Sequence, residues 1–315
     1  MSRRLRVGVF GVGSLGQHHA RIYALCETVD LVGVHDVDAA RAADVAARCG
    51  TRAFADLEEL ARAVEAASVV VPTDRHHEVA GQLLERGVHL LVEKPIASTT
   101  GEAEDLVRRA GEKSLILQVG HVERFNPVMQ FLEEHISQPR FIEAIRLAPY
   151  PPPREAAAPR GTEVSVVLDL MIHDLEIILH LVRAPVREIH AVGVPVLSSS
   201  EDIANTRIVF SNGCVANVTA SRISQEKMRK IRVFQADTYV SLDYMNQAGQ
   251  LCRKTPAGIV VEAVPIEKGD PLTEELKSFV QCVLDRHEPV VTGRHASNAL
   301  RLATDICRCI RENPS

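Results

Sequence analysis

The chain has 315 residues, a formal net charge of −5, 46% hydrophobic residues and 24% charged residues. This length suggests two domains with buried cores, and the composition is that of an ordinary globular protein. No long basic run suggests a nucleic-acid surface, and the apolar start is too short for a signal peptide or a membrane span. Seven scattered cysteines without a Cys-x-x-Cys pair favour reduced thiols and a cytoplasmic protein.

Short apolar runs alternate with amphipathic stretches over residues 1–121. Strands are predicted at Leu5–Phe10, Leu31–His35, Ser68–Val71, His89–Val92 and Leu115–Val119. Helices are predicted at Gly16–Ala24, Asp38–Cys49, Asp56–Ala63, His76–Arg86 and Thr99–Glu112. Nearly all-apolar strands separated by helices are typical of a parallel sheet covered on both faces. Residues 1–121 are therefore predicted to form a doubly wound α/β domain of the Rossmann type.

A different pattern follows from Arg140 onward. A proline-rich stretch leads into a long apolar helix, predicted at Val166–Val182. Strands are predicted at Ile189–Val194, Thr206–Phe210, Val215–Ala220, Ile231–Gln235, Tyr239–Asp243 and Ile259–Val264, and helices at Thr273–Asp285 and His295–Arg311. Consecutive strands without intervening helices indicate an antiparallel sheet. Residues 122–315 are therefore predicted to form an α+β domain with an open, mostly antiparallel sheet, whose last helix could pack back on the first domain.

A glycine-rich turn, Gly11-Val12-Gly13-Ser14-Leu15-Gly16, lies between the first predicted strand and helix. This is the context in which Gly-x-Gly-x-x-Gly binds a dinucleotide. The first glycine permits a tight turn, the second lets a pyrophosphate approach the backbone, and the third allows close helix packing. The helix N-terminus then supplies amide donors for the anion.

An acidic residue stands where the ribose of a dinucleotide would bind. Asp36 ends the second predicted strand, twenty residues past Gly16. Its carboxylate would bond the ribose hydroxyls and repel a 2′-phosphate, which favours NAD over NADP. Arg41 follows nearby and leaves NADP open, although a helical arginine is usually solvated.

Three further residues could move a proton. Lys94 comes at the end of the predicted strand that begins at His89, where ligands of open parallel sheets bind. Asp169 and His173 are four residues apart and share one face of a predicted helix. An imidazole can accept a hydroxyl proton, and a carboxylate can orient it. From these residue types alone, a structural pair on an apolar helix is the stronger interpretation.

Four ordered motifs resemble the glucose–fructose oxidoreductase, inositol dehydrogenase and rhizopine-catabolism (Gfo/Idh/MocA) family. They are the glycine turn, Val71-Pro72-Thr73-Asp74-Arg75-His76, Glu93-Lys94-Pro95 and Asp169-Leu170-Met171-Ile172-His173. The resemblance covers nearly the whole chain. It implies an NAD-dependent oxidoreductase acting on a sugar or polyol CH–OH, an open C-terminal sheet used for oligomerisation, and a cis bond between Lys94 and Pro95. Met171 departs from the glycine that many members carry.

The resemblance also implies the site residues. The catalytic residues are Lys94, Asp169 and His173: His173 is the base, Asp169 its partner and Lys94 an electrostatic aid, with the roles of Lys94 and His173 exchangeable. The cofactor-binding residues are Gly11, Gly13, Ser14, Leu15, Gly16, Asp36, Pro72, Thr73, His76, Glu93 and Lys94. Hydride transfer from a sugar carbon to NAD is the implied reaction.

The stretch from Gly120 to Pro127, with the Asp169–His173 motif, resembles the branch that oxidises the 3-hydroxyl of UDP-N-acetylglucosamine. That branch supplies a 3-keto sugar to an aminotransferase for lipid A or polysaccharide synthesis. The substrate contacts expected on this basis are His121, Arg124, Asn126, Arg154 and Arg160. Arginine forks in the last two positions match a diphosphate.

Three alternatives stay open. The chain could oxidise a free sugar or inositol, or it could be a dinucleotide-sensing regulator without turnover, although a sensor need not keep proton-transfer groups. The adjacent pairs His18–His19 and His76–His77 suggest metal binding as the third alternative. Neighbouring helical residues diverge by about 100°, so no metal site is predicted. The expected partners are the small-molecule substrate, the aminotransferase and copies of the chain in a homodimer or homotetramer, with no nucleic acid or membrane.

Overall fold

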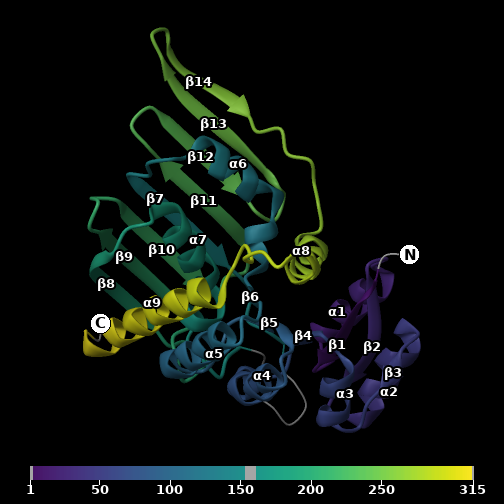
Figure 1. Cartoon of the computed structure of the whole chain (residues 1–315). Coiled ribbons are helices and arrows are strands. Elements are labelled where there is room, and N and C mark those ends of the chain that lie inside the picture. The colour runs from purple at the N-terminus through teal and green to yellow at the C-terminus, as the bar shows by residue number, and fades with distance from the viewer. Residues whose placement is uncertain (1–2, 153–160, 314–315) are drawn as a thin grey trace. The chain divides into compact units, whose positions relative to one another are not determined.

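The computed structural model describes residues 3–152 and 161–313 (Figure 1). The chain divides into two compact units. The first unit contains Met1–Val122 and Asp270–Ser297, and the second contains Glu123–Gly269 and Asn298–Ser315. The chain enters the second unit one residue after the expected boundary at 121/122, and then returns to the first unit near its end.

The first unit is built on a six-stranded parallel sheet. Its strands are β1 (Leu5–Phe10), β2 (Val29–His35), β3 (Arg52–Ala53), β4 (Ala66–Val69), β5 (His89–Glu93) and β6 (Leu117–Gly120). In the strand order β3-β2-β1-β4-β5-β6, successive strands are added toward one edge of the sheet from β1 to β3 and toward the other edge from β4 to β6. This is the doubly wound order of dinucleotide-binding folds, so the predicted Rossmann sheet is confirmed.

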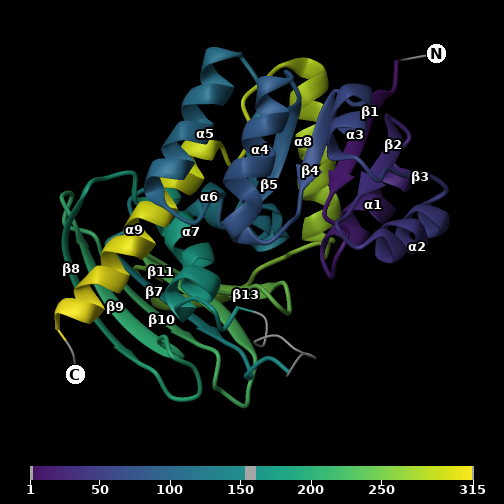
Figure 2. The ribbon, with the colours of Figure 1, turned by 90° about the horizontal axis from the view of Figure 1, so that it is seen from below.

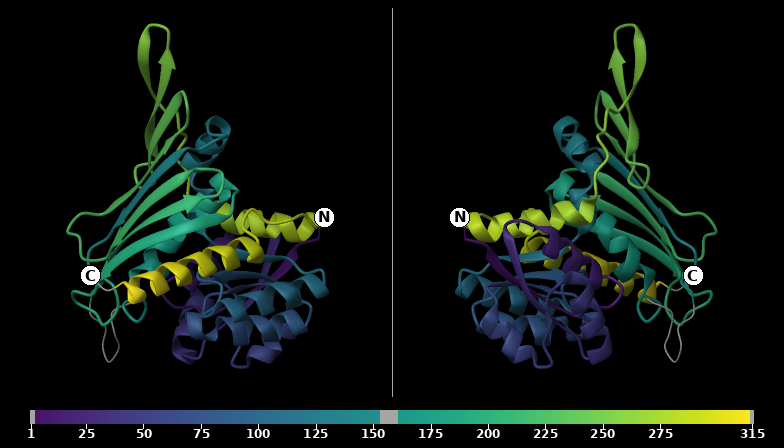
Figure 3. Two further views of the ribbon diagram at one scale, coloured as in Figure 1. Left: turned by 90° about the vertical axis from the view of Figure 1, so that its left-hand side faces the viewer. Right: turned by 90° about the vertical axis from the view of Figure 1, so that its right-hand side faces the viewer.

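Helices cover both faces of this sheet. They are α1 (Gly16–Leu25), α2 (Ala39–Cys49), α3 (Leu57–Ala63), α4 (His76–Glu85), α5 (Thr100–Glu112) and α8 (Pro271–Asp285). One hydrophobic cluster contains residues of α1, α2 and α8 together with Leu5, Val7 and Val9, every second residue of β1. Leu276 and Phe279 of α8 are fully buried in it. On the opposite face, Gly8 of β1 leaves room for Leu60 of α3, and Figure 3 shows α4 and α5 on this side.

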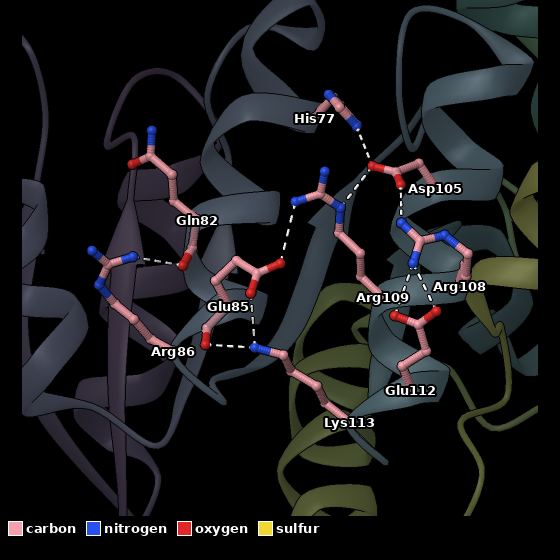
Figure 4. A network of polar contacts seen from close by, with 9 residues as sticks. All are labelled: His77, Gln82, Glu85, Arg86, Asp105, Arg108, Arg109, Glu112 and Lys113. Carbon is pink, nitrogen blue, oxygen red and sulfur yellow. Dashed lines mark hydrogen bonds and ion pairs between the residues drawn. The ribbon is translucent and has the colours of Figure 1, made fainter.

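Local sequence signals explain where these helices begin. Thr99 caps α5, since its hydroxyl accepts the Glu102 amide while the Glu102 carboxylate accepts the Thr99 amide. Asp38 caps α2, which ends at Gly50 in the left-handed conformation. The exposed sides of α4 and α5 carry a charged network (Figure 4). In it, Asp105 accepts bonds from His77 and Arg109 at 2.8 and 2.7 Å.

The second unit contains an eight-stranded sheet in the order β14-β13-β12-β11-β7-β10-β9-β8. Its strands are β7 (Phe141–Leu147), β8 (Val186–Val194), β9 (Ile203–Phe210), β10 (Val215–Ser221), β11 (Met228–Phe234), β12 (Thr238–Asp243), β13 (Ala248–Thr255) and β14 (Gly258–Ala263). All neighbours are antiparallel except β7 and β10. The mostly antiparallel sheet is therefore confirmed, and the edge hairpin β13–β14 is visible in Figure 3.

Three helices and a π-helical segment accompany this sheet. They are α6 (Pro127–His135), η3 (Val167–Met171), α7 (Ile172–Val182) and α9 (Gly293–Glu312), of which α9 runs from the first unit into the second. Figure 2 shows α7 and α9 along one face of the sheet. Gly193 of β8 lets α9 approach, because a Cβ there would lie 3.0 Å from Ile310. Within the described ranges 3–152 and 161–313, no helix is long and apolar enough to cross a membrane.

Among the strands and α-helices of the described residues, four were missed by the sequence pattern: β3, β7, α6 and β13. The two-residue β3 is too short to show a period, and β13 buries only Leu251 among polar residues. Helix α8 was expected in the C-terminal domain but belongs to the first unit, because its apolar stripe completes that unit's core. The helix predicted at Val166–Val182 is present, with a π-helical first turn.

Candidate active site

The glycine turn of the first unit has the shape that a pyrophosphate cradle requires. Gly11 has a φ of +87°, and a Cβ there would lie 2.6 Å from the Val70 carbonyl oxygen. A Cβ on Gly16 would collide with the carbonyl of Gly11, so α1 packs directly on the turn. A Cβ on Gly13, in contrast, would have no atom within 4 Å. Two glycines thus shape the turn, and the third leaves its backbone approachable at the start of α1, which fits a bound pyrophosphate.

Asp36 is held beside this turn. Its Oδ2 accepts the Val12 amide at 2.8 Å, and its Oδ1 accepts the Asp38 amide at 2.9 Å. Arg41 lies 3.3 Å from Oδ1 and also pairs with Asp38 at 2.9 Å. Next to it, the Val37 side chain is 97% exposed. The carboxylate is therefore fixed between the turn and the end of β2, where the ribose of a dinucleotide would lie.

Glu93, at the end of β5, contacts the neighbouring Lys94 and buried residues of the first unit. The Lys94–Pro95 peptide bond is cis, as the resemblance implies. The Glu93 carboxylate accepts the Lys94 amide at 3.2 Å and lies against Gly120, where a Cβ would come within 2.9 Å of it. On its other side, the His19 Nε2 is 3.3 Å from Glu93 Oε1. Lys94 itself is half-buried.

His76 joins two of the strand-end loops. Its Nδ1 lies 2.8 Å from the Pro95 carbonyl oxygen, and its Nε2 lies 2.9 Å from that of Val71. Burial lowers the pKa of His76, while the two carbonyl contacts favour its protonated form. Thr73, which begins the short 3-10 turn before α4, is half-buried, and Pro72 just before it is exposed. His76 therefore links the segment that carries Thr73 to the one that carries Lys94.

A buried polar chain that the sequence did not reveal lies below this site. His19 Nδ1 is 3.1 Å from Ser68 Oγ, which is 2.9 Å from the Tyr23 hydroxyl. Glu275 of α8 is fully buried, and neither of its carboxyl oxygens has a hydrogen-bond partner among the described residues. Burial, reinforced by the charge of Glu93, raises the pKa of Glu275 well above its ordinary value. Burial and the nearby negative charge thus both favour the protonated form of the Glu275 carboxyl group.

Asp169 and His173 lie on consecutive turns in the second unit. Asp169 is in the π-helical segment η3, and His173 is in the first turn of α7. Both side chains are half-buried. Single π-helical turns inside α-helices are frequent at functional sites. The four-residue spacing thus keeps both groups on neighbouring turns, where a carboxylate and an imidazole can serve one proton transfer.

The residues expected to contact substrate have other contacts in the second unit. Arg124 is buried and pairs with Glu176 at 2.8 Å and with Glu133 at 3.4 Å. Asn126 is also buried: it caps α6 and donates to the Tyr244 carbonyl at 3.0 Å. These contacts give both residues a structural role, and their contact with substrate stays a prediction. Arg154 and Arg160 lie outside the described residues.

His121, the remaining expected substrate contact, is buried directly after β6 in the first unit.

In the part of the chain that the structure describes, no three His, Cys, Asp or Glu side chains gather as metal ligands would. His19 and His76 instead have the contacts given above with Glu93, Ser68 and two backbone carbonyls.

Comparisons with known proteins agree with this geometry. Residues 5–121 match the oxidoreductase family with an NAD-binding Rossmann fold, and residues 132–237 match the GFO/IDH/MocA C-terminal domain. The UDP-N-acetylglucosamine 3-dehydrogenase of Acidithiobacillus ferrooxidans is 39% identical over 92% of this chain and 93% of that protein. A scyllo-inositol 2-dehydrogenase (NAD(+)) of Bacillus subtilis is 24% identical, covering 94% of this chain and 91% of its own length.

The fold extends this likeness over the whole molecule. A solved structure of the A. ferrooxidans enzyme superimposes with a TM-score of 0.92 at 36% identity, covering 99% of both chains. Fold and site thus define a dinucleotide-binding oxidoreductase, a dehydrogenase that acts on CH–OH groups. The chain belongs to the Gfo/Idh/MocA family.

Proposed function

We propose that this protein oxidises the 3-hydroxyl of a UDP-N-acetylhexosamine to a 3-keto sugar with NAD as the hydride acceptor. The observation that carries the proposal is the full-length likeness to a UDP-N-acetylglucosamine 3-dehydrogenase at 39% identity. Lys94, Asp169 and His173 are all present at partly accessible positions. They supply the proton-transfer groups that such an oxidation needs.

The cofactor proposed is NAD rather than NADP. The Asp36 carboxylate is fixed by two backbone amides beside the glycine turn, so a 2′-phosphate brought to this position would meet a negative charge. Arg41 is occupied by Asp36 and Asp38. Calorimetric titration of the protein with NAD⁺ and with NADP⁺ tests this assignment. Tighter binding of NADP⁺ would overturn it without affecting the proposed substrate.

Each catalytic residue has a distinct role in the proposed reaction. When bound, NAD supplies the carbon that accepts the hydride. His173 takes the proton of the hydroxyl, and Asp169 orients the imidazole and stabilises its charged form. Lys94 stabilises the negative charge that develops on the oxygen. The roles of Lys94 and His173 can also be exchanged.

The experiment is single-turnover formation of NADH, followed by absorbance, with NAD-loaded protein and UDP-N-acetylglucosamine. His173→Asn and Lys94→Ala are expected to slow NADH formation by at least about 100-fold while NAD⁺ still binds, because general-base catalysis contributes about 10²–10⁴-fold. His287→Asn and Lys113→Ala are matched controls at exposed positions, expected to react at the wild-type rate. Near-normal rates for both site variants would refute the assigned roles.

The same assay separates the alternatives. NADH formed from free sugars or inositols, but not from the UDP-sugar, would make the protein a dehydrogenase of simple polyols. NAD⁺ binding without NADH formation from any of them would indicate a sensor. For the proposed reaction, the 3-keto product has the carbonyl that an aminotransferase needs, so such an enzyme is the proposed pathway partner.

We further propose that copies of the chain associate through the open face of the second unit's sheet. Partly exposed aromatic residues lie there on neighbouring strands: Phe234 is 5.7 Å from Phe141 and 4.4 Å from Tyr239, measured between ring centroids. Light scattering should give the mass of a dimer or tetramer, and a monomer at micromolar concentration would refute the association.

The seven cysteines, all within the described residues, are free thiols, which supports a cytoplasmic location.

A further inference from the structure

The segment that precedes η3 contacts the Asp169 carboxylate through a glycine. Gly161 has a φ of +81°, and its Cα faces the Asp169 side chain. A Cβ at Gly161 would lie 2.8 Å from the carboxyl carbon of Asp169 and closer still to Oδ2. Real Cβ atoms do not approach other atoms so closely. The carboxylate therefore occupies the space that any side chain at position 161 would need.

A buried arginine holds this glycine in place. The Arg222 side chain is 2% exposed, although arginine is rarely buried to this extent. It donates to the Gly161 carbonyl and, at 2.8 Å, to the Val164 carbonyl. Its Nε donates to Asp202 Oδ1 at 2.8 Å. The guanidinium thus fixes both ends of the four-residue stretch that begins at Gly161.

The partner of this arginine is itself fixed by backbone. Asp202 Oδ2 accepts the amides of Val196, Leu197 and Ser198 at 2.6–2.9 Å. Arg222 holds the pKa of Asp202 below its ordinary value, against the opposing effect of burial. Both charges are buried and hydrogen-bonded, so losing either partner would leave an uncompensated buried charge. The pair thus ties the Gly161 carbonyl to the backbone amides that bind Asp202.

Hydrogen bonds connect the segment before η3 to the loop between β8 and β9, which contains Asp202. The Val166 amide donates to the Glu201 carbonyl at 2.9 Å, and the Ser200 hydroxyl donates to the Val164 carbonyl at 2.9 Å. The Asp169 amide then bonds the Ser165 carbonyl at 3.1 Å. Asp169 is therefore located from two sides, by its own backbone and by Gly161 against its carboxylate.

We propose that Gly161, held by Arg222, is the positioning element for the Asp169 carboxylate. Its absent side chain provides the space in which the carboxylate is held. This inference rests on the proposed function, because it assigns a purpose to the position of Asp169. Neither Gly161 nor Arg222 touches the reacting atoms, so both are positioning residues.

The test compares two glycines that have nearly the same positive φ. Gly161→Ala and Gly213→Ala both place alanine at a positive φ, +81° and +85° respectively. A Cβ at Gly213 meets nothing within 4 Å, whereas one at Gly161 meets the Asp169 carboxylate. The difference between the two variants therefore reports the displaced carboxylate, free of the cost of the strained backbone.

Single-turnover kinetics and a pH profile give the readouts. Gly161→Ala is expected to lower the rate constant of hydride transfer by about 100-fold relative to Gly213→Ala, since a 1 Å misplacement can cost that much. The acid limb of its pH–rate profile should move to lower pH, because a carboxylate beside an imidazole favours the protonated ring. NAD⁺ affinity should be the same in both variants.

Two further variants keep the outcome decisive. If Gly161→Ala fails to fold, Ser200→Ala removes one bond to the Val164 carbonyl more gently, and should shift the same pH profile with a smaller loss of rate. Equal rates and equal profiles in Gly161→Ala and Gly213→Ala would overturn the inference. Asp169→Asn at the wild-type rate would instead overturn the role of Asp169 in the proposed function.

Discussion

The raised pKa of Glu275 predicts how the stability of the protein depends on pH. Its carboxyl group is fully buried in the first unit, and its pKa is raised by burial and by Glu93. In the unfolded chain the pKa returns to about 4.3. Between these two pKa values the folded protein binds one proton more than the unfolded chain. The free energy of unfolding therefore falls as pH rises, by about 1.4 kcal/mol per pH unit for this one group.

Glu275→Gln keeps the shape of the side chain and removes the titration. From pH 5.5 to pH 7.5 the wild-type protein therefore loses stability through this proton, at up to about 1.4 kcal/mol per pH unit, and the variant does not. Relative to wild type, Glu275→Gln should therefore gain stability between pH 5.5 and pH 7.5. Urea unfolding followed by circular dichroism at both pH values measures the difference.

A neighbouring carboxylate provides the control. Glu274 is on the same helix but exposed, in a surface pair with Lys277 at 3.0 Å. Glu274→Gln should change stability by less than about 1 kcal/mol at both pH values, because exposed pairs contribute little. If the Glu275→Gln difference is the same at pH 5.5 and 7.5, Glu275 is ionised in the folded protein and the reasoning is wrong.

Two further predictions concern charged contacts. Arg124→Met should destabilise the protein by about 3–5 kcal/mol in the same urea assay, because it leaves the buried Glu176 carboxylate without its partner. The double variant with Glu176→Leu should recover most of this loss. A normal stability with a raised KM would instead favour the predicted substrate contact. Asp105→Asn should cost less than about 1 kcal/mol at pH 7. His77, together with the arginines of α5, lowers the pKa of Asp105 to about 2, so this difference should disappear as pH falls from about 4 through 2; a difference that persists at pH 2 would contradict the ion pairing.

Much of the fold and the cofactor cradle could be predicted because their signals are local. Gly11, Gly13 and Gly16 fall within six residues, and the apolar runs of the first unit alternate with clear helix starts. Strand β7 was missed because its buried face includes Arg146 and its half-buried face includes Phe141 and Ile145, so the sequence shows no apolar–polar alternation.

The supporting residues could not be predicted, because their partners are distant in sequence. Arg222 is twenty residues from Asp202 and sixty-one from Gly161, and no spacing rule connects them. Glu275 looks like any other helical glutamate until its helix is placed in the first unit's core. Arg124 was expected to contact substrate on the strength of the resemblance alone, whereas its buried partner Glu176 becomes its neighbour only after folding.

The return of the chain to the first unit has a consequence for synthesis. Helix α8 supplies Leu276, Phe279 and Val280 to the core formed by residues near the N-terminus. On the ribosome, that core stays incomplete until nearly the whole chain has emerged, after all eight strands of the second unit. A nascent fragment ending near residue 122 would expose the apolar surface that α8 covers. Because α9 follows α8 and supplies the last segment of the second unit, both units are completed only at the end of synthesis.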